Sequence, residues 1–309
     1  ENFYEVLSGY PHVRYFMVSE NKLKNIDSVA SMHSLLSLDA SQNELKTAKF
    51  LAQPSCLSHL QTINLAQNKI KVIEGLVLPR LRRLVLDENE IKSLEHIKGH
   101  QSLEYLSVKK NKLKNFKGLE NLTRLKELQL SENEIKVWEG LGPLPQLHTL
   151  NLQTNQLTVI PEQLPEIPKL RALVLTENKL KDAKQVPRLL GYKSLQELSI
   201  SANPFEEELG GDARKQIIIS LCVSRSPTIH LSRIISKVND EPFGEEEQTA
   251  LIEELVQQAE EERIRKAEEE EERRQKEEEE KRIREEEERE RKEKEEERPD
   301  APRIPDPRE

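Results

Sequence analysis

The sequence predicts an α/β solenoid of stacked short repeats followed by a long charged helix, and two observations support this fold class. Each of nine asparagines has apolar residues eight, five and three positions before it and two positions after it. After the last of them, the composition changes to a long run of glutamate, lysine and arginine. A fixed period predicts a repeat architecture and takes precedence over local signals. The recurring asparagines are Asn21, Asn43, Asn68, Asn89, Asn111, Asn133, Asn155, Asn178 and Asn203.

The unit around Asn89, with Leu81, Leu84, Leu86 and Ile91, shows the repeat. It follows the leucine-rich-repeat pattern L-x-x-L-x-L-x-x-N-x-L, whose units have about 20–29 residues. The alternating part predicts a short strand with its leucines facing inward. We expect the asparagine amide to pair backbone groups of the turn that follows, so that stacked copies form a ladder. The few residues left in each unit predict 3₁₀ or single-turn helix on the convex side.

Four regions are predicted along the chain. Residues 1–205 form the solenoid of about nine repeats, and residues 206–244 form a C-terminal cap, because end repeats expose apolar edges. Residues 245–298 form a charged helix, and residues 299–309 a proline-containing extended tail. The chain begins at Glu1 without methionine, and Phe3 and Tyr4 look like the end of an earlier unit. We therefore expect a further N-terminal segment.

Composition argues for an intracellular protein that is not an enzyme. The net charge of −9 conceals a mildly basic solenoid and an acidic tail, with 30 acidic and 16 basic residues in 241–309. Cys56 and Cys222 lie in different modules, and no run of 18 apolar residues suggests a membrane span. His96 and His100 lack a third metal ligand, and no nucleophile cluster or phosphate-binding loop is present. We expect no cofactor, no metal and no catalytic residue. Nucleic acid is not expected as a partner, because no aromatic platform accompanies the small basic excess.

The segment from Glu245 to Arg298 contains neither glycine nor proline and carries many acid–base pairs at i,i+4 spacing, which stabilise a helix. Beyond Ala259 its only apolar residues are Ile264, Ala267 and Ile283, so the seam of a coiled coil is missing and a single solvated helix is favoured. The helix is either a strut that reaches a second partner or a tail that keeps the protein soluble. An apolar stripe at its start is expected to anchor it on the cap or on a partner: Leu251, Ile252, Leu255 and Val256.

Two surfaces are candidate protein-binding sites. The concave face should present Tyr15 and Met17, and also a patch of Arg83, Val85, Tyr105 and Lys109 on adjacent repeats. Tyrosine and arginine are enriched at interface hot spots, although any concave face must be filled by something polar or small. A lysine row lies three residues after the asparagines and could bind an acidic partner such as tubulin tails or this chain's own tail. Alternatively, acids such as Glu74 and Glu95 neutralise it. The row consists of Lys24, Lys46, Lys71, Lys92, Lys114, Lys136 and Lys181.

The 22-residue repeat resembles the subfamily typified by the nuclear regulator of protein phosphatase 1, which includes axonemal proteins. Residues 8–21 (SGYPHVRYFMVSEN) and 168–178 (PKLRALVLTEN) look like the leucine-rich-repeat subunit of the ciliary radial spoke. The resemblance spans about residues 5–260. It implies a non-enzymatic scaffold in the axoneme of cilia or flagella, with other radial-spoke proteins as partners. The alternatives are a regulatory subunit of a protein phosphatase and a cytosolic factor for axonemal assembly.

Overall fold

A computed structural model describes residues 9–52, 57–97, 100–209, 213–223 and 235–244, and scattered positions from 246 to 276. The chain divides into two compact units, Glu1–Thr249 and Ala250–Glu309. The strands are β1 (Tyr15–Met17), β2 (Ser37–Asp39), β3 (Thr62–Asn64), β4 (Arg83–Val85), β5 (Tyr105–Ser107), β6 (Glu127–Gln129), β7 (Thr149–Asn151), β8 (Ala172–Val174), β9 (Glu197–Ser199), β10 (Lys237–Val238) and β11 (Glu241–Pro242). The helices are η1 (Asp27–Ser31), η2 (Lys49–Ala52), η3 (Glu95–Ile97), η4 (Ala183–Gly191), α2 (Phe205–Leu209) and α3 (Ala213–Val223).

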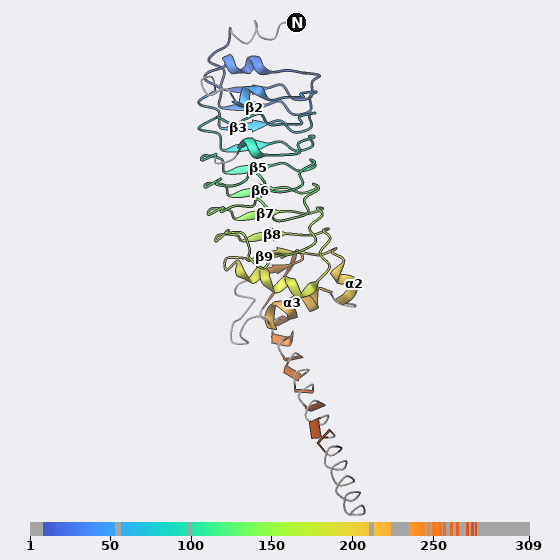
Figure 1. The fold of residues 1–309 in the computed structure, drawn as a ribbon. Coiled ribbons are helices and arrows are strands. Elements are labelled where there is room, and N and C mark those ends of the chain that lie inside the picture. The colour runs from blue at the N-terminus through green and yellow to red at the C-terminus, as the bar shows by residue number, and fades with distance from the viewer. Residues whose placement is uncertain are drawn as a thin grey trace, which may run out of the picture. The chain divides into compact units, whose positions relative to one another are not determined.

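The described strands form one sheet in chain order, in which each repeat contributes one strand from β1 to β9. Figure 1 labels β2, β3 and β5 to β9 of this series. Neighbouring strands from β1 to β10 are parallel, and β11 pairs with β10 in the antiparallel sense. The register places the middle residues of successive strands side by side, as with Leu84, Leu106 and Leu128. These leucines are fully buried, because residues alternate between the two faces of a strand. The leucine-rich-repeat solenoid predicted from the sequence is therefore present.

The asparagines link each repeat to the one before it. Asn133 is 6% exposed, and its Nδ2 donates to the carbonyls of Leu130 and Ser131 in its own repeat. The same Nδ2 donates to the carbonyl of Val108 in the preceding repeat at 2.8 Å, and Oδ1 accepts from the amide of Leu113 at 3.0 Å. Both inter-repeat bonds recur at Asn43, Asn68, Asn89, Asn111, Asn155, Asn178 and Asn203.

Asn21 differs from the other asparagines of the series. It is exposed, and its amide donates only within its own turn, to the carbonyls of Val18 and Ser19. In the described part of the chain, Asn43 is the first asparagine with contacts to the repeat before it.

A left-handed residue precedes every asparagine of the series. The φ angles of these nine residues lie between +51° and +59°, and none of them is glycine. This backbone region is uncommon for residues that carry a Cβ. The turn after each strand thus has the same backbone shape, whichever side chain the left-handed residue carries. The nine residues are Glu20, Gln42, Gln67, Glu88, Lys110, Glu132, Thr154, Glu177 and Ala202.

The chain returns between strands through short irregular segments and 3₁₀ helices, as the length of the repeat predicted. Phe50 and Phe116 are fully buried in these return segments. Gly118 and Gly140 also lie there, with φ angles of +96° and +88°. A Cβ on Gly118 would lie 2.0 Å from the carbonyl oxygen of Leu94 in the preceding repeat. Close backbone contact between successive return segments therefore requires glycine here.

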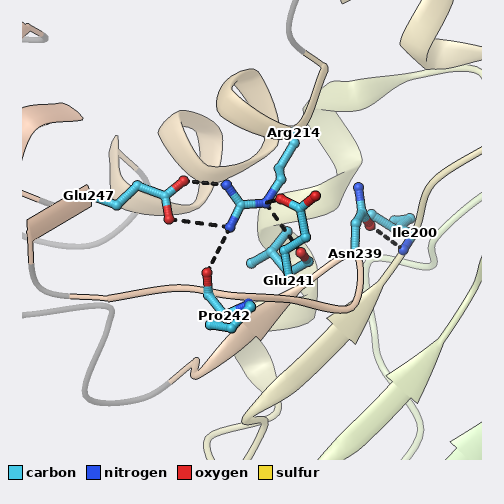
Figure 2. A network of polar contacts seen from close by, with 7 residues as sticks. Ile200, Arg214, Asn239, Glu241, Pro242 and Glu247 are labelled. Atoms are coloured by element: carbon cyan, nitrogen blue, oxygen red, sulfur yellow. Dashed lines mark hydrogen bonds and ion pairs between the residues drawn. The ribbon is translucent and has the colours of Figure 1, made fainter.

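After the ninth repeat the described chain forms α2, α3 and the β10–β11 hairpin. Ile217, Ile218 and Leu221 of α3 are buried, as is Val238 of β10. Arg214 connects α3 to the hairpin, as Figure 2 shows. Its guanidinium donates to the carbonyls of Val238 and Pro242 at 3.3 and 3.1 Å and pairs with the carboxylates of Glu241 and Glu247. In the same view Asn239 Oδ1 accepts from the amide of Ile200, which follows β9, at 2.8 Å.

The second unit contributes only scattered described residues. Those from Ala250 to Lys276 have helical backbone. The predicted helix over 245–298 and the extended tail over 299–309 lie mostly outside the described residues and stay predictions. Among the residues described, no helix combines the length and the apolar character needed to cross a membrane.

His100 is a half-buried histidine whose surroundings oppose its protonation. A carbonyl can only accept a hydrogen bond, so Nε2–H donates to Leu78 O at 2.9 Å. Nδ1 is buried and has no hydrogen-bond partner among the described residues. Burial lowers the pKa of His100 below 6.5, and the hydrogen bond to Leu78, which raises it, only partly offsets this effect. The folded protein therefore binds this proton less readily than the unfolded chain.

We expect this histidine to make the free energy of unfolding depend on pH. Its contribution is complete above the unfolded pKa and is lost progressively as pH falls below about 6.5. Urea unfolding at about pH 7.5 and 5.5 measures the change. The variant His100→Gln keeps a donor for the Leu78 carbonyl and does not titrate, so it should lose less stability over this interval. Equal losses in the two proteins would contradict the assignment.

Candidate protein-interaction surface

The concave face is formed by the first and third residues of each strand. One row contains Tyr15, Arg83 and Tyr105 at the first position, and the other contains Met17 and Val85 at the third. These side chains point away from the core because the middle residues of β2 to β9 are buried and Phe16 of β1 is half-buried. The face is a continuous sheet surface of fixed spacing, which suits binding of a protein segment.

Arg83 and Tyr105 are in direct contact on this face. Their Cα positions are paired between β4 and β5, and the Arg83 Cζ lies 3.6 Å from the centroid of the Tyr105 ring. A guanidinium over an aromatic face is worth about 0.5–1 kcal/mol at exposed sites. The stack holds the rotamer-rich Arg83 side chain against the Tyr105 ring, which lowers the entropic cost of binding a partner there.

Asp87, another residue that the register predicts for the concave face, organises the same part of it. Its Oδ1 accepts from the Ser107 hydroxyl at 2.6 Å and from the backbone amide of Lys109 at 2.8 Å. Val85 pairs with Ser107 in the register. The structure thus brings Arg83, Val85, Tyr105 and Lys109 onto two adjacent repeats.

Tyr15 and Met17 lie apart from this patch. They belong to β1, and two strands, β2 and β3, separate it from β4. Tyr15 is 66% exposed and Met17 is 74% exposed. They form a separate apolar area at the first described strand, and the sequence-based set of concave residues therefore covers two places on the sheet.

The seven members of the lysine row are all exposed. They lie on the side of the solenoid where the chain leaves each strand, which we call the carboxyl edge. Acidic and basic residues are mixed there, and ion pairs join Glu44 to Lys69 at 3.7 Å and Glu90 to Lys112 at 3.5 Å. Neither lysine belongs to the row, so these acids balance charge next to the row rather than on it.

The apolar stripe at the start of the predicted charged helix is described only in part. Leu251 is 7% exposed, whereas Val256 is 63% exposed. Ile252 and Leu255 lie outside the described residues. The anchoring role assigned to these four residues stays a prediction.

Sequence reasoning overlooked a second basic surface, on the side where the chain begins each strand, which we call the amino edge. A buried leucine there is flanked by basic residues in three alternate repeats. The signal was visible in the sequence as a basic–Leu–basic triplet, but only the register shows that the three copies lie in line. The triplets are Arg80-Leu81-Arg82, Arg124-Leu125-Lys126 and Lys169-Leu170-Arg171.

Glu104 lies between two of these triplets and interacts with both. Its carboxylate accepts from Lys126 Nζ at 2.7 Å and lies 3.8 Å from Arg82 Nε. The hydrogen bond from Lys126, together with the nearby Arg82 and Arg124 charges, holds the pKa of Glu104 below its usual value. This carboxylate stays ionised near neutral pH and keeps the two basic side chains in place.

A hollow of about 570 Å³ lies in the return segments of the sixth and seventh repeats. Trp138, Val159 and Leu164 contribute to its walls, and Trp138 Nε1 donates to the carbonyl of Val159 at 2.9 Å. In the described part of the chain, no group of three or more His, Cys, Asp or Glu side chains could hold a metal ion.

Comparisons with known proteins agree with the repeat architecture. Three family models match: "Leucine Rich repeats (2 copies)" over residues 58–99, "Leucine rich repeat" over 79–135 and "Leucine-rich repeat" over 118–226. None of them is a catalytic family. A leucine-rich-repeat protein of Leptospira interrogans has a similar structure, with a TM-score of 0.58 and 26% identity, over 72% of this chain and 56% of that one.

Two curated relatives match over shorter stretches. Leucine-rich repeat-containing protein 23 of Bos taurus is 37% identical over 86 residues, which cover 28% of this chain and 24% of that protein. Protein NUD1 of Saccharomyces cerevisiae is 38% identical over 97 residues, 30% of this chain and 11% of its own length. This chain thus spans a quarter or less of either relative. The family matches and the sheet of stacked strands together show that residues 58–226 consist of leucine-rich repeats.

Proposed function

We propose that this protein is a non-enzymatic scaffold of the axoneme of cilia or flagella, as a structural subunit of the radial spoke. It would dock one partner on the repeat surface and reach another with the charged helix. Residues 206–244 would cap the solenoid, with Arg214 holding α3 to the β10–β11 hairpin. The observation that carries the scaffold role is the concave patch around the Arg83–Tyr105 stack. Its side chains are held in place before a partner binds, which suits protein recognition.

The axonemal part of the proposal has separate support. It rests on the resemblance of residues 8–21 and 168–178 to the radial-spoke subunit. The similarity to leucine-rich repeat-containing protein 23 supports a leucine-rich-repeat scaffold in general terms. The repeat length is also compatible with a regulatory subunit of a protein phosphatase, and a cytosolic assembly factor would use the same surfaces. These two alternatives are outcomes of the tests below.

Fractionation of isolated axonemes tests the location. Stepwise salt extraction followed by mass spectrometry should recover the protein together with radial-spoke subunits and not with the detergent-soluble fraction. Recovery in a soluble complex with a phosphatase would favour the regulatory subunit. Recovery in the cytosol and absence from purified axonemes would favour the assembly factor. Either result would end the axonemal proposal.

The docking patch has its own test, Tyr105→Ala in the full chain. This change removes the ring beneath Arg83 and should reduce recovery with spoke subunits, as expected for a hot spot worth about 2 kcal/mol, or roughly thirty-fold in affinity. The matched control is Thr149→Ala, two strands away on the same row. Normal recovery of the Tyr105 variant, with an unchanged melting temperature in both proteins, would exclude this patch as the docking site.

A further inference from the structure

The amino edge has a regular arrangement of positive charge that the proposed function does not use. In each of the three triplets the central leucine is fully buried. The two flanking side chains must therefore point away from the core, and all six are exposed. Because Arg80, Arg124 and Lys169 occupy the same position in alternate repeats, the basic pairs recur with a period of two repeats.

Backbone hydrogen bonds fix these residues in one straight row. The amide of Glu104 donates to Arg82 O, that of Lys126 to Glu104 O, that of His148 to Lys126 O and that of Arg171 to His148 O, each at 2.8 Å. This is continuous parallel pairing, with strands about 4.8 Å apart. Arg82, Lys126 and Arg171 therefore follow one another at intervals of about 10 Å.

The balance of charge differs sharply between the two edges. In the fourth to eighth repeats, the positions nine to six before the asparagine contain seven basic and two acidic residues. In the same repeats, the positions from two before to six after the asparagine contain ten basic and nine acidic residues. The lysine row therefore lies in a nearly neutral surrounding. The amino edge keeps an excess of five positive charges even when Glu104, which pairs with Lys126 and Arg82, is counted among its acids.

We propose that the amino edge of the fourth to eighth repeats binds an extended acidic segment of a partner protein, which lies across the strands. Carboxylates along such a segment would meet the arginine and lysine pairs one after another. A polyproline-II chain rises about 3.1 Å per residue with three residues per turn, so acids at every third position recur every 9 Å or so on one side. That interval matches the spacing of the basic pairs. Arginine favours carboxylates because its guanidinium can bind them bidentately.

A protein segment fits this edge better than a single-stranded nucleic acid. Bases need exposed aromatic faces on which to stack. The aromatic side chain of this part of the face is Tyr105, and Arg83 already covers its ring. This inference rests on the scaffold role proposed above, because it names the partner chemistry of the repeat surface. It does not depend on an axonemal location.

Fluorescence anisotropy with purified components tests the inference in the full chain. The probe is a fluorescein-labelled, proline-rich peptide with glutamate at every third position, and the control probe has glutamine at those positions. The variant Arg82→Gln/Arg124→Gln/Arg171→Gln removes one charge from each triplet. The matched variant Lys92→Gln/Lys114→Gln/Lys136→Gln removes three charges from the lysine row and changes the net charge equally.

The glutamate peptide should bind to the unmodified protein at about 0.15 M salt and the glutamine peptide should not. The arginine variant should bind at least about tenfold more weakly, and the lysine variant should change affinity less than about twofold. Equal losses in the two variants would mean unspecific attraction and would overturn the proposal. Failure of the glutamate peptide to bind, or tighter arginine-dependent binding of a single-stranded oligonucleotide, would also overturn it. None of these outcomes bears on where the protein is located, so failure here is distinct from failure of the axonemal proposal.

Discussion

Replacement of Asn133 by alanine should lower the free energy of unfolding by about 3 kcal/mol. The change removes the bond to the Leu113 amide and the shared donation to the Val108, Leu130 and Ser131 carbonyls. A buried polar group left without a partner costs about 1–3 kcal/mol, and alanine leaves at least one amide and one carbonyl in that state. Urea unfolding followed by circular dichroism measures the loss.

Asn21→Ala is the matched control for this prediction, because Asn21 is exposed and donates only within its own turn. Its effect should stay below about 1 kcal/mol, since water can replace both bonds. If the Asn133 variant also lost less than about 1 kcal/mol of unfolding free energy, the leucine core and not the asparagine ladder would hold successive repeats together.

Gly118→Ala should destabilise the protein at least as strongly, by about 4 kcal/mol, or prevent folding. The new Cβ would lie 2.0 Å from the Leu94 carbonyl oxygen and 2.5 Å from the Glu95 amide nitrogen. Both are backbone atoms of the preceding repeat, so no side chain can rotate away. The φ angle of +96° adds strain for any residue with a Cβ.

A graded series keeps this prediction testable if the Gly118 variant does not fold. Gly140→Ala brings a Cβ to 2.7 Å from the Lys117 amide nitrogen and should cost less. Gly244→Ala meets nothing within 4 Å and should change the free energy of unfolding by less than about 0.5 kcal/mol. Melting temperatures that do not decrease in the order Gly244, Gly140, Gly118 would contradict the contact geometry.

The sequence predicted the solenoid because the leucine spacing within each repeat predicts one strand without reference to the other repeats. Leu81, Leu84 and Leu86 have the spacing that only this fold explains, and the structure buries all three. The concave positions followed from the same alternation, which is why Arg83 and Tyr105 could be named in advance. Their contact could not be, because it depends on which rotamers two exposed side chains adopt.

The amino edge was missed for a different reason. Arg80, Arg124 and Lys169 are 44 and 45 residues apart in the sequence. Only the parallel register places them in line, and the two repeats between them carry serine and glutamine at the same position. The lysine row follows seven of the nine asparagines at the same spacing, so it is easier to see in the sequence than a basic row that skips alternate repeats.

The left-handed residue before each asparagine makes this solenoid unusually tolerant of change at one point on its surface. Since the backbone there costs roughly 1 kcal/mol for any side chain with a Cβ, exchanging one such residue for another alters the strain very little. The nine copies already include glutamate, glutamine, lysine, threonine and alanine. Each repeat thus has one surface position at which the charge of the side chain can change with little effect on backbone strain. Two solenoids with the same core could therefore bind different partners through substitutions at these nine residues alone.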